Sequence, residues 1–294
     1  MHGERVPLTC RVCDSPTGRI GSVRGAYAGR EFELRRCPSC RFAFVSDPWL
    51  DFEKTYDDAY YEGRGADPLV DYAFELAHPD QTIRRWEWEG ITRVVGTLTS
   101  VREGTRWLDF GCGNGGLVRH LRSTRAIDAV GFEEGAMVRR LDAYGIPHIP
   151  RDDLAEAGPF DVVTAIEVLE HVLDPVAELR TMASCLKPGG LLFVTTGNAA
   201  PYAKRLTHWR YVVPELHISF FEPQTLAAAY ERAGLVAEWP GFVVGWPEIY
   251  KFRVLKNLRL RRVTPLTSAL PTVQLARLAD RKAQLSRHPA ARLP

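Results

Sequence analysis

The chain has 294 residues, of which 45% are hydrophobic and 25% are charged, and its formal net charge is +2. This composition is sufficient for a full α/β domain plus a small module, and it excludes a chain that is disordered throughout. No apolar run approaches the roughly 18–20 residues that a membrane span needs, and the first ten residues lack the apolar centre of a signal peptide, so we expect a cytoplasmic protein.

Four of the six cysteines form two C-x2-C pairs near the start of the chain. The pairs are CRVC at 10–13 and CPSC at 37–40, and a Gly-rich segment with strand-like pieces separates them. Four thiolates at this spacing suit the tetrahedral coordination of Zn²⁺, whereas a redox dithiol would need only one pair. We therefore predict a zinc ribbon over residues 1–46. Its structural zinc would have no open position for catalysis, and its ligands would be Cys10, Cys13, Cys37 and Cys40.

An aromatic and acidic connector follows at 47–80, and residues 81–98 show the apolar periodicity of an amphipathic helix. After it, strands and helices alternate along residues 81–247. Strands are predicted at 105–110, 126–132, 160–166 and 190–196, and helices near 116–124, 134–144 and 175–186. Such alternation is typical of a doubly wound, mostly parallel α/β sheet of the Rossmann-like kind, which binds its ligands at the carboxyl ends of the strands.

A glycine-rich turn, DFGCGNGG, follows the first of these strands. Its glycines, Gly111, Gly113 and Gly115, would let a ligand approach the backbone, and the N-terminus of the following helix favours polar or anionic groups. Cys112 lies among them and is expected to be a small packed residue. The same turn also satisfies the dinucleotide fingerprint G-x-G-x-x-G of NAD enzymes. Glu133 after the next strand could hold the ribose of NAD or of another cofactor that contains a nucleoside. The turn alone therefore does not identify the cofactor.

Taken with later motifs, the chain resembles the class I S-adenosylmethionine-dependent methyltransferases over roughly residues 82–245. The shared motifs are Asp109-x-Gly111-x-Gly113-x-Gly115, Glu133, RDDL at 151–154, FDVVTAIEVLEHVLDP at 160–175 and CLKPGGLLFVTT at 185–196. The resemblance implies S-adenosylmethionine as cofactor, bound along the glycine turn. Asp109 would position the methionine amino group, Glu133 the ribose, and Asp152 or Asp153 the adenine amino group. An NAD-dependent oxidoreductase or a non-catalytic scaffold explains these motifs less well.

A polar cluster follows the third strand of this domain. In a helical turn Glu167, beside the cofactor, would share one face with Glu170 and His171, and such side chains can bind Mg²⁺ or a related divalent ion. The cluster resembles the Glu-x-x-Glu-His metal site of ubiquinone-pathway O-methyltransferases and of plant small-RNA 2′-O-methyltransferases. In the latter a further histidine comes from beyond the fifth strand, and His217 lies in the corresponding region. Two alternatives stay open: His171 is a general base without metal, or the cluster only begins the next helix, with Asp174 as its cap.

The layout of the whole chain also resembles a bacterial group with an N-terminal zinc ribbon, whose characterised members modify sugars, lipids or natural products. Methyl transfer requires an aligned nucleophile and removal of its proton, for which Glu170, His171 and His217 are the candidates. A metal ion in this cluster could bind two neighbouring hydroxyl groups of the acceptor, which favours O-methylation of a sugar, glycolipid or polyol. C-methylation of a keto-sugar or natural product and RNA methylation are the alternatives. Nucleic acid is not the expected partner, because residues 1–250 are net acidic.

The charge of the chain is distributed unevenly. Residues 251–294 contain 11 Lys or Arg and one acidic residue, whereas the rest contains 27 Lys or Arg and 35 Asp or Glu. We predict a basic, helical tail over 248–294 with an amphipathic helix at 251–263. This helix either contacts an anionic membrane surface or a lipid-linked sugar at the inner membrane face, or packs its apolar side on the domain. The segment 208–217 is expected to form a mobile substrate loop.

Overall fold

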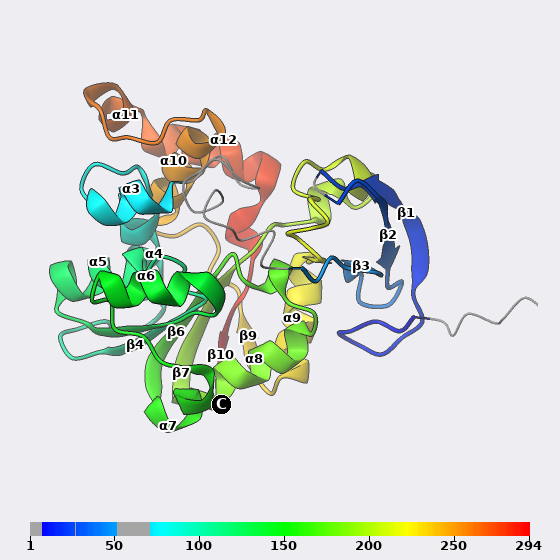
Figure 1. Ribbon diagram of the computed structural model, residues 1–294, viewed down its shortest axis with the longest axis horizontal. Coiled ribbons are helices and arrows are strands. Elements are labelled where there is room, and N and C mark those ends of the chain that lie inside the picture. Colours follow the sequence, from blue (N-terminus) through cyan, green and yellow to red (C-terminus); the bar gives the residue numbers. More distant parts are fainter. Residues whose placement is uncertain (1–7, 27, 52–70) are drawn as a thin grey trace, which may run out of the picture.

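The computed structural model describes residues 8–26, 28–51 and 71–294 and contains two sheets (Figure 1). Most of the predicted connector, residues 52–70, lies outside the described residues. The larger sheet has the strand order β5-β4-β6-β7-β10-β9. Its strands are β4 (Arg106–Phe110), β5 (Asp128–Phe132), β6 (Phe160–Ile166), β7 (Leu186–Thr195), β9 (Val236–Glu238) and β10 (Ala290–Arg292). Strands β4 to β7 are parallel and β10 is antiparallel to both its neighbours, which confirms the predicted mostly parallel sheet.

Helices cover both faces of this sheet because successive side chains of a strand point to opposite faces, and apolar side chains lie on both. In β4, Leu108 and Phe110 join an apolar cluster with α8 and α9, whereas Trp107 joins a second cluster with α4, α5 and α10. These helices are α4 (Arg84–Leu98), α5 (Gly116–Arg125), α8 (Pro175–Ser184), α9 (Pro223–Arg232) and α10 (Trp246–Asn257). The other helices are α3 (Tyr72–Ala77), α6 (Val138–Ala143), α7 (Leu154–Ala157), α11 (Pro265–Ala269) and α12 (Thr272–Ala283). The core therefore has the two layers that a doubly wound sheet requires.

Helix α8 begins as the sequence predicts. Asp174 is its N-cap, and its side chain accepts a hydrogen bond from the backbone N–H of Ala177 at 2.9 Å, while Pro175 occupies the first helical position. Its C-terminal boundary differs slightly from the prediction. The sequence KPGG lies inside β7, which already begins at Leu186, and Gly189 has a φ of +73° within that strand.

The smaller sheet joins the N-terminal module to the rest of the chain. Its order is β1-β2-β3-β8, and all its neighbouring strands are antiparallel. Three strands come from the module, namely β1 (Gly18–Arg24), β2 (Glu31–Arg36) and β3 (Ala43–Val45), and the fourth is β8 (Ser219–Phe220). The module lies beside the main domain (Figure 1), and the segment that leads to β8 packs against it. Its fourth strand thus comes from outside the predicted 1–46 unit.

The C-terminal segment is helical, as predicted, but it also contributes a strand that the sequence did not indicate. Strand β10 lies between β7 and β9, and Gly189 and Leu293 extend the pairing through a backbone hydrogen bond of 2.8 Å. The predicted helix at 251–263 is only partly correct, because residues 251–257 form the end of α10 and residues 258–263 lie beyond it. Phe252 and Leu255 are buried, so this helix packs its apolar side on the domain. In the described part of the chain, no helix has the length and apolar character needed to span a membrane.

Candidate active site

The glycine turn between β4 and α5 depends on its glycines for both backbone conformation and space. Gly111, Gly113 and Gly115 have φ angles of +72°, +55° and +71°. A Cβ at Gly111 would lie 2.6 Å from a methyl carbon of Val168, and a Cβ at Gly115 would lie 2.5 Å from one of Ile146. Larger residues would therefore be strained and would also displace packed neighbours.

Two acidic residues flank this turn at the carboxyl edge of the sheet. Glu133 accepts hydrogen bonds from the backbone N–H of Gly113 at 2.6 Å and of Glu134 at 2.9 Å, and burial raises the pKa of its carboxyl group. Asp109 accepts a hydrogen bond from the Thr164 hydroxyl at 2.8 Å, and burial raises its pKa to about 7. The predicted cofactor residues Asp109, Gly111, Gly113, Gly115 and Glu133 are thus brought together.

The remaining predicted cofactor residues differ in exposure. Cys112 is buried, and burial raises the pKa of its thiol well above the usual range, as expected of a packed residue. Asp152 and Asp153 are exposed in a short 3-10 helix. The preceding segment runs beside β5, because Ile149 donates its N–H to the Gly131 carbonyl at 2.8 Å. The two aspartates therefore follow β5 toward the edge of the sheet that carries Glu133.

Glu167 lies at the carboxyl end of β6 in the left-handed conformation, with φ of +57°. Its carboxylate accepts two hydrogen bonds from Arg253 of α10, at 2.8 and 3.1 Å, and others from Tyr211 and Thr195, each at 3.1 Å. Burial alone would raise the pKa of Glu167, but the Arg253 guanidinium holds it well below the usual range. Because Arg253 is far away in sequence and belongs to no motif, nothing near Glu167 indicated this partner.

A cluster of Glu170, His171 and His217 lies next to this pair. One potential ligand atom from each of these residues lies within 4.8 Å of the other two. Glu170 and His171 belong to a 3-10 turn, Leu169–His171, and not to the α-helical turn that was expected. Glu167 is not part of the cluster, so the structure brings together three of the four residues considered as ligands of a divalent ion.

The histidine rings of this cluster are held by backbone carbonyl oxygens. Nδ1 of His171 lies 2.9 Å from the Leu216 oxygen, and Nδ1 of His217 lies 2.6 Å from the Tyr211 oxygen. Because a carbonyl oxygen only accepts, these contacts place the proton of a neutral ring on Nδ1, and Nε2 then carries the lone pair. The ring centroids are 4.9 Å apart and meet edge to face.

Glu170 is fully buried, and its two carboxylate oxygens differ in their surroundings. Oε1 accepts a hydrogen bond from the Tyr211 hydroxyl, whereas Oε2 has no partner of good hydrogen-bond geometry in the described part of the chain, although the nearby Thr196 hydroxyl lowers the pKa of this carboxyl group. Burial, and then the charge of Glu167, raise the pKa of Glu170 to about 8. A buried carboxylate oxygen without a donor of good geometry, beside two imidazoles, fits a divalent cation.

Tyr211 was not predicted as a site residue, although it lies inside the segment 208–217 that the sequence singled out. Its hydroxyl contacts both Glu167 and Glu170, and its ring stacks on His217 with centroids 4.1 Å apart. Tyr211 therefore contacts both glutamates that follow β6 and one of the two histidines of the cluster. A tyrosine two residues after a tryptophan gives no sequence signal for such a role.

A row of buried charged groups connects the glycine turn to Glu167. Asn114 donates a hydrogen bond to Glu75 at 3.0 Å, and Arg84 donates to Glu75 at 2.9 Å and to Glu87 at 2.8 Å. Glu87 in turn lies 3.6 Å from Arg253, which binds Glu167. Glu75 and Glu87 are 6% and 3% exposed, so their charges require these partners.

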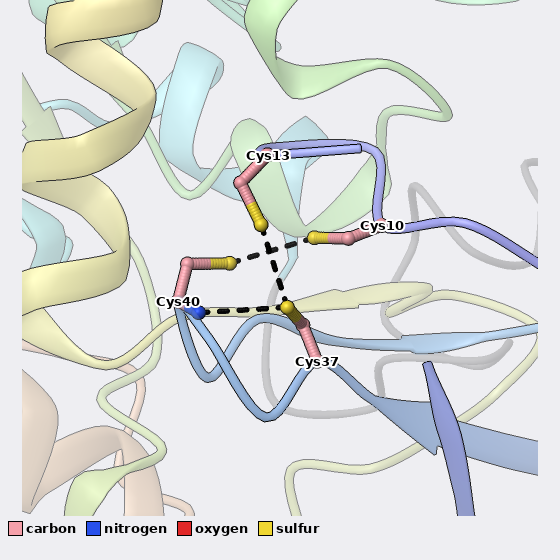
Figure 2. Close-up of side chains that lie close together, drawn as sticks. All are labelled: Cys10, Cys13, Cys37 and Cys40. Atoms are coloured by element: carbon pink, nitrogen blue, oxygen red, sulfur yellow. Dashed lines mark hydrogen bonds between the residues drawn. The ribbon is translucent and has the colours of Figure 1, made fainter. Parts of the chain in front are cut away.

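The four N-terminal cysteines converge from two loops (Figure 2). One Sγ atom from each lies within 4.8 Å of the others, and none forms a disulfide. The backbone N–H groups of Val12 and Cys40 lie 3.4 Å from the sulfurs of Cys10 and Cys37. Four converging thiols with N–H donors to the sulfur atoms fit a tetrahedral zinc ion.

The chain is similar to known proteins over its larger domain. Residues 81–238 match the family model described as a methyltransferase domain. The chain is 35% identical over 185 residues to a ubiquinone biosynthesis O-methyltransferase of Xanthomonas axonopodis pv. citri, an alignment that covers 53% of this chain and 77% of that protein. It is 36% identical over 225 residues to the protein of the same name from Caulobacter vibrioides, covering 70% of this chain and 83% of that protein.

The chain therefore belongs to the methyltransferase domain family. It is an S-adenosylmethionine-dependent methyltransferase, and S-adenosylmethionine is its cofactor.

Proposed function

We propose that this enzyme transfers the methyl group to a hydroxyl of a small molecule and that Glu170, His171 and His217 hold a divalent metal ion beside that hydroxyl. The observation that carries the proposal is the buried Oε2 atom of Glu170, which has no partner of good hydrogen-bond geometry among the described residues and lies beside two imidazoles. The names of the two relatives, both O-methyltransferases of ubiquinone biosynthesis, support oxygen as the acceptor atom.

The donor set suggests which metal ion is preferred. Two imidazoles and one carboxylate suit Mn²⁺, Fe²⁺ or Zn²⁺ better than Mg²⁺, which prefers oxygen ligands. Glu167 would have added a second carboxylate, but Arg253 neutralises it. We therefore include Mg²⁺ among the candidate ions and expect Mn²⁺ to bind more tightly.

The residues of the chain have separate roles in the proposed reaction. When bound, the ion lowers the pKa of a coordinated hydroxyl. Tyr211 fixes Glu170 through Oε1, and the carbonyl groups of Leu216 and Tyr211 orient the two histidines so that Nε2 carries the lone pair. In the alternative without metal, His171 Nε2 accepts the hydroxyl proton directly.

The cofactor is assigned to the glycine turn, at the same edge of the sheet. We infer that Gly111, Gly113, Gly115 and Cys112 line it. Asp109 would hold the methionine amino group, Glu133 the ribose, and Asp152 or Asp153 the adenine. Burial and the N–H donors around Glu133 support its place in the site, because a ribose diol can replace backbone donors there.

The proposed acceptor carries two neighbouring hydroxyl groups, as a sugar, a glycolipid or another polyol does, because two oxygens can bind one metal ion together. A lipid-linked acceptor is consistent with the exposed leucines that the C-terminal segment presents beside its basic residues. These include Leu258, Leu266 and Leu278, which are 63%, 74% and 62% exposed. Contact with the surface of a membrane would follow from such an acceptor.

We further propose that the four N-terminal cysteines hold a structural zinc ion. The convergence of their sulfurs and the buried positions of Cys10 and Cys37 support it. The apolar side chains of the module pack on the main domain, so a zinc ion would add to the stability that this packing provides.

The function is tested by measuring methyl transfer from labelled S-adenosylmethionine to a panel of sugars, polyols and other diols with Mn²⁺, with Mg²⁺ and with EDTA. We expect Mn²⁺-dependent activity on a diol and at least a 100-fold loss in Glu170→Gln. Zinc content is measured in parallel, since EDTA can also remove a metal ion from the cysteine site. Full activity in EDTA together with unchanged activity of Glu170→Gln would disprove the metal-assisted reaction.

A further inference from the structure

Four consecutive residues, Glu215–Ile218, connect the N-terminal module to the candidate metal site. On the side of the site, the Leu216 carbonyl lies 2.9 Å from His171 Nδ1, and His217 is itself a member of the cluster. The N–H of Ile218 donates to the backbone carbonyl of Glu170 at 2.7 Å. Three of these four residues thus fix, or belong to, the proposed ligand set.

The same four residues are held from the opposite side by the N-terminal module. The carbonyl of Ile218 accepts the N–H of Val45, the last residue of β3, at 2.9 Å. Glu215 is 1% exposed, and its Oε1 accepts the backbone N–H of Ala28 at 3.0 Å. Backbone hydrogen bonds therefore run from β3 through Ile218 to Glu170.

The fit around Glu215 is close. A Cβ at Gly25 would lie 2.3 Å from Glu215 Oε1, so the absence of a side chain at residue 25 makes room for the carboxylate. Beyond it, β8 pairs with β3, and the apolar side chains of the module pack on residues of the segment that leads to β8. The packed residues are Phe32, Leu34, Val45, Leu206, Val212, Ile218 and Phe220.

We propose that the N-terminal module positions the acceptor side of the active site, with Glu215 as the positioning residue that joins the two. Glu215 acts through the backbone of residues 216–218, which sets the places of Glu170, His171 and His217. Ligand groups must be held within about 0.5 Å of their working positions, and an unanchored segment would lose conformational entropy on binding. The role assigned to these three side chains rests on the function proposed above.

The test uses the full chain and a matched pair of variants. Glu215→Leu removes the acceptor for the Ala28 N–H, whereas Glu215→Gln keeps an oxygen there, and Arg19→Ala on the exposed part of β1 is a control within the module. Hydrogen exchange of residues 211–220, the Kd of Mn²⁺ and the Kd of S-adenosylmethionine are measured for each. We expect Glu215→Leu to increase exchange of 211–220 and to weaken Mn²⁺ binding, each at least tenfold. Cofactor affinity should stay within twofold, and Glu215→Gln and Arg19→Ala should match the wild type.

Unchanged exchange and Mn²⁺ affinity in Glu215→Leu, or equal effects of the Leu and Gln variants, overturn the proposal. If Glu215→Leu no longer binds the cofactor because it fails to fold, Gly25→Ala decides. Its new Cβ would lie 2.3 Å from the Glu215 carboxylate and 2.6 Å from the Phe32 ring, so it disturbs this contact from the module side, and the same selective loss must appear. If the wild type binds no Mn²⁺, the metal-assisted function fails, but the exchange of 211–220 still tests the positioning role.

Discussion

The two halves of the active site are built in different ways. The proposed cofactor side consists of the end of β4, the glycine turn and the end of β5, within residues 109–133, and of Asp152 and Asp153 in the short 3-10 helix that follows. The acceptor side is assembled from segments far apart in sequence, namely the 3-10 turn after β6, residues 211–218, Arg253 of α10 and the N-terminal module. A site made of one continuous motif tolerates changes elsewhere, whereas a site made of distant segments depends on each contact between them.

The largest expected effect comes from removing a contact that only the acceptor side has. Arg253→Met leaves the carboxylate of Glu167 without its cation. Because this side chain is largely buried but still 25% exposed, we expect a loss of roughly 3 kcal/mol in the free energy of unfolding, the lower end of the range for breaking a buried ion pair. Urea denaturation measures this loss. The double variant Arg253→Met with Glu167→Gln should recover a large part of it, and a double variant as unstable as the single one would contradict the ion-pair explanation.

The second prediction concerns the cofactor side. Gly115→Ala places a Cβ 2.5 Å from a methyl carbon of Ile146 in a left-handed conformation, so we expect at least a 100-fold weaker binding of S-adenosylmethionine by calorimetry. Gly104→Ala is the matched control, because its φ is +76° but no atom lies within 4 Å of the added Cβ. Mn²⁺ binding should persist in both variants, because the neighbours that crowd residue 115 are outside the cluster of Glu170, His171 and His217; its loss in Gly115→Ala would mean that the two sides are not separable.

The third prediction concerns the pH dependence of the cofactor side. Burial raises the pKa of Asp109 to about 7, so the carboxyl group is neutral below that pH and anionic above it. Only the anion attracts the methionine ammonium group, so affinity for S-adenosylmethionine should fall about tenfold from pH 8 to pH 6. Asp109→Asn should bind weakly and without this pH dependence. A wild-type affinity that is flat over this range would exclude Asp109 from the role.

The smallest effect is expected at a helix end that belongs to neither side. Asp174→Ala removes the cap of α8, which should cost about 1 kcal/mol of stability in urea denaturation. Asp174→Asn retains an acceptor and should be close to the wild type. Neither variant should alter the Kd of S-adenosylmethionine or of Mn²⁺. A change in either Kd would mean that the acceptor side extends as far as α8.

The difference between the two halves also explains what could be predicted from the sequence. The strands, the glycine turn and Glu133 were predictable because periodicity and motif spacing are local properties. Tyr211, Arg253 and Glu215 were not, since their roles depend on contacts with residues more than 40 positions away. Glu167 was considered a metal ligand together with Glu170, and the local pattern gave no sign that Arg253 would pair with it.

The β8 and β10 strands were missed for a similar physical reason. Each has only two or three residues, too few to show the alternation that identifies a strand. Both are stabilised by strands formed much earlier in the chain, β3 and β7. The four cysteines, by contrast, were recognisable from spacing alone, and their sulfurs do converge.

A row of buried, paired groups runs from Asn114, beside the glycine turn, through Glu75, Arg84 and Glu87 to Arg253 and Glu167. None of these charges can lose its partner inside the protein without a cost. A change of charge or position at one end of the row would therefore alter the electrostatic environment at the other end. Any coupling between the two substrates that passed through this row would be reciprocal, so that each would change the affinity for the other by the same factor.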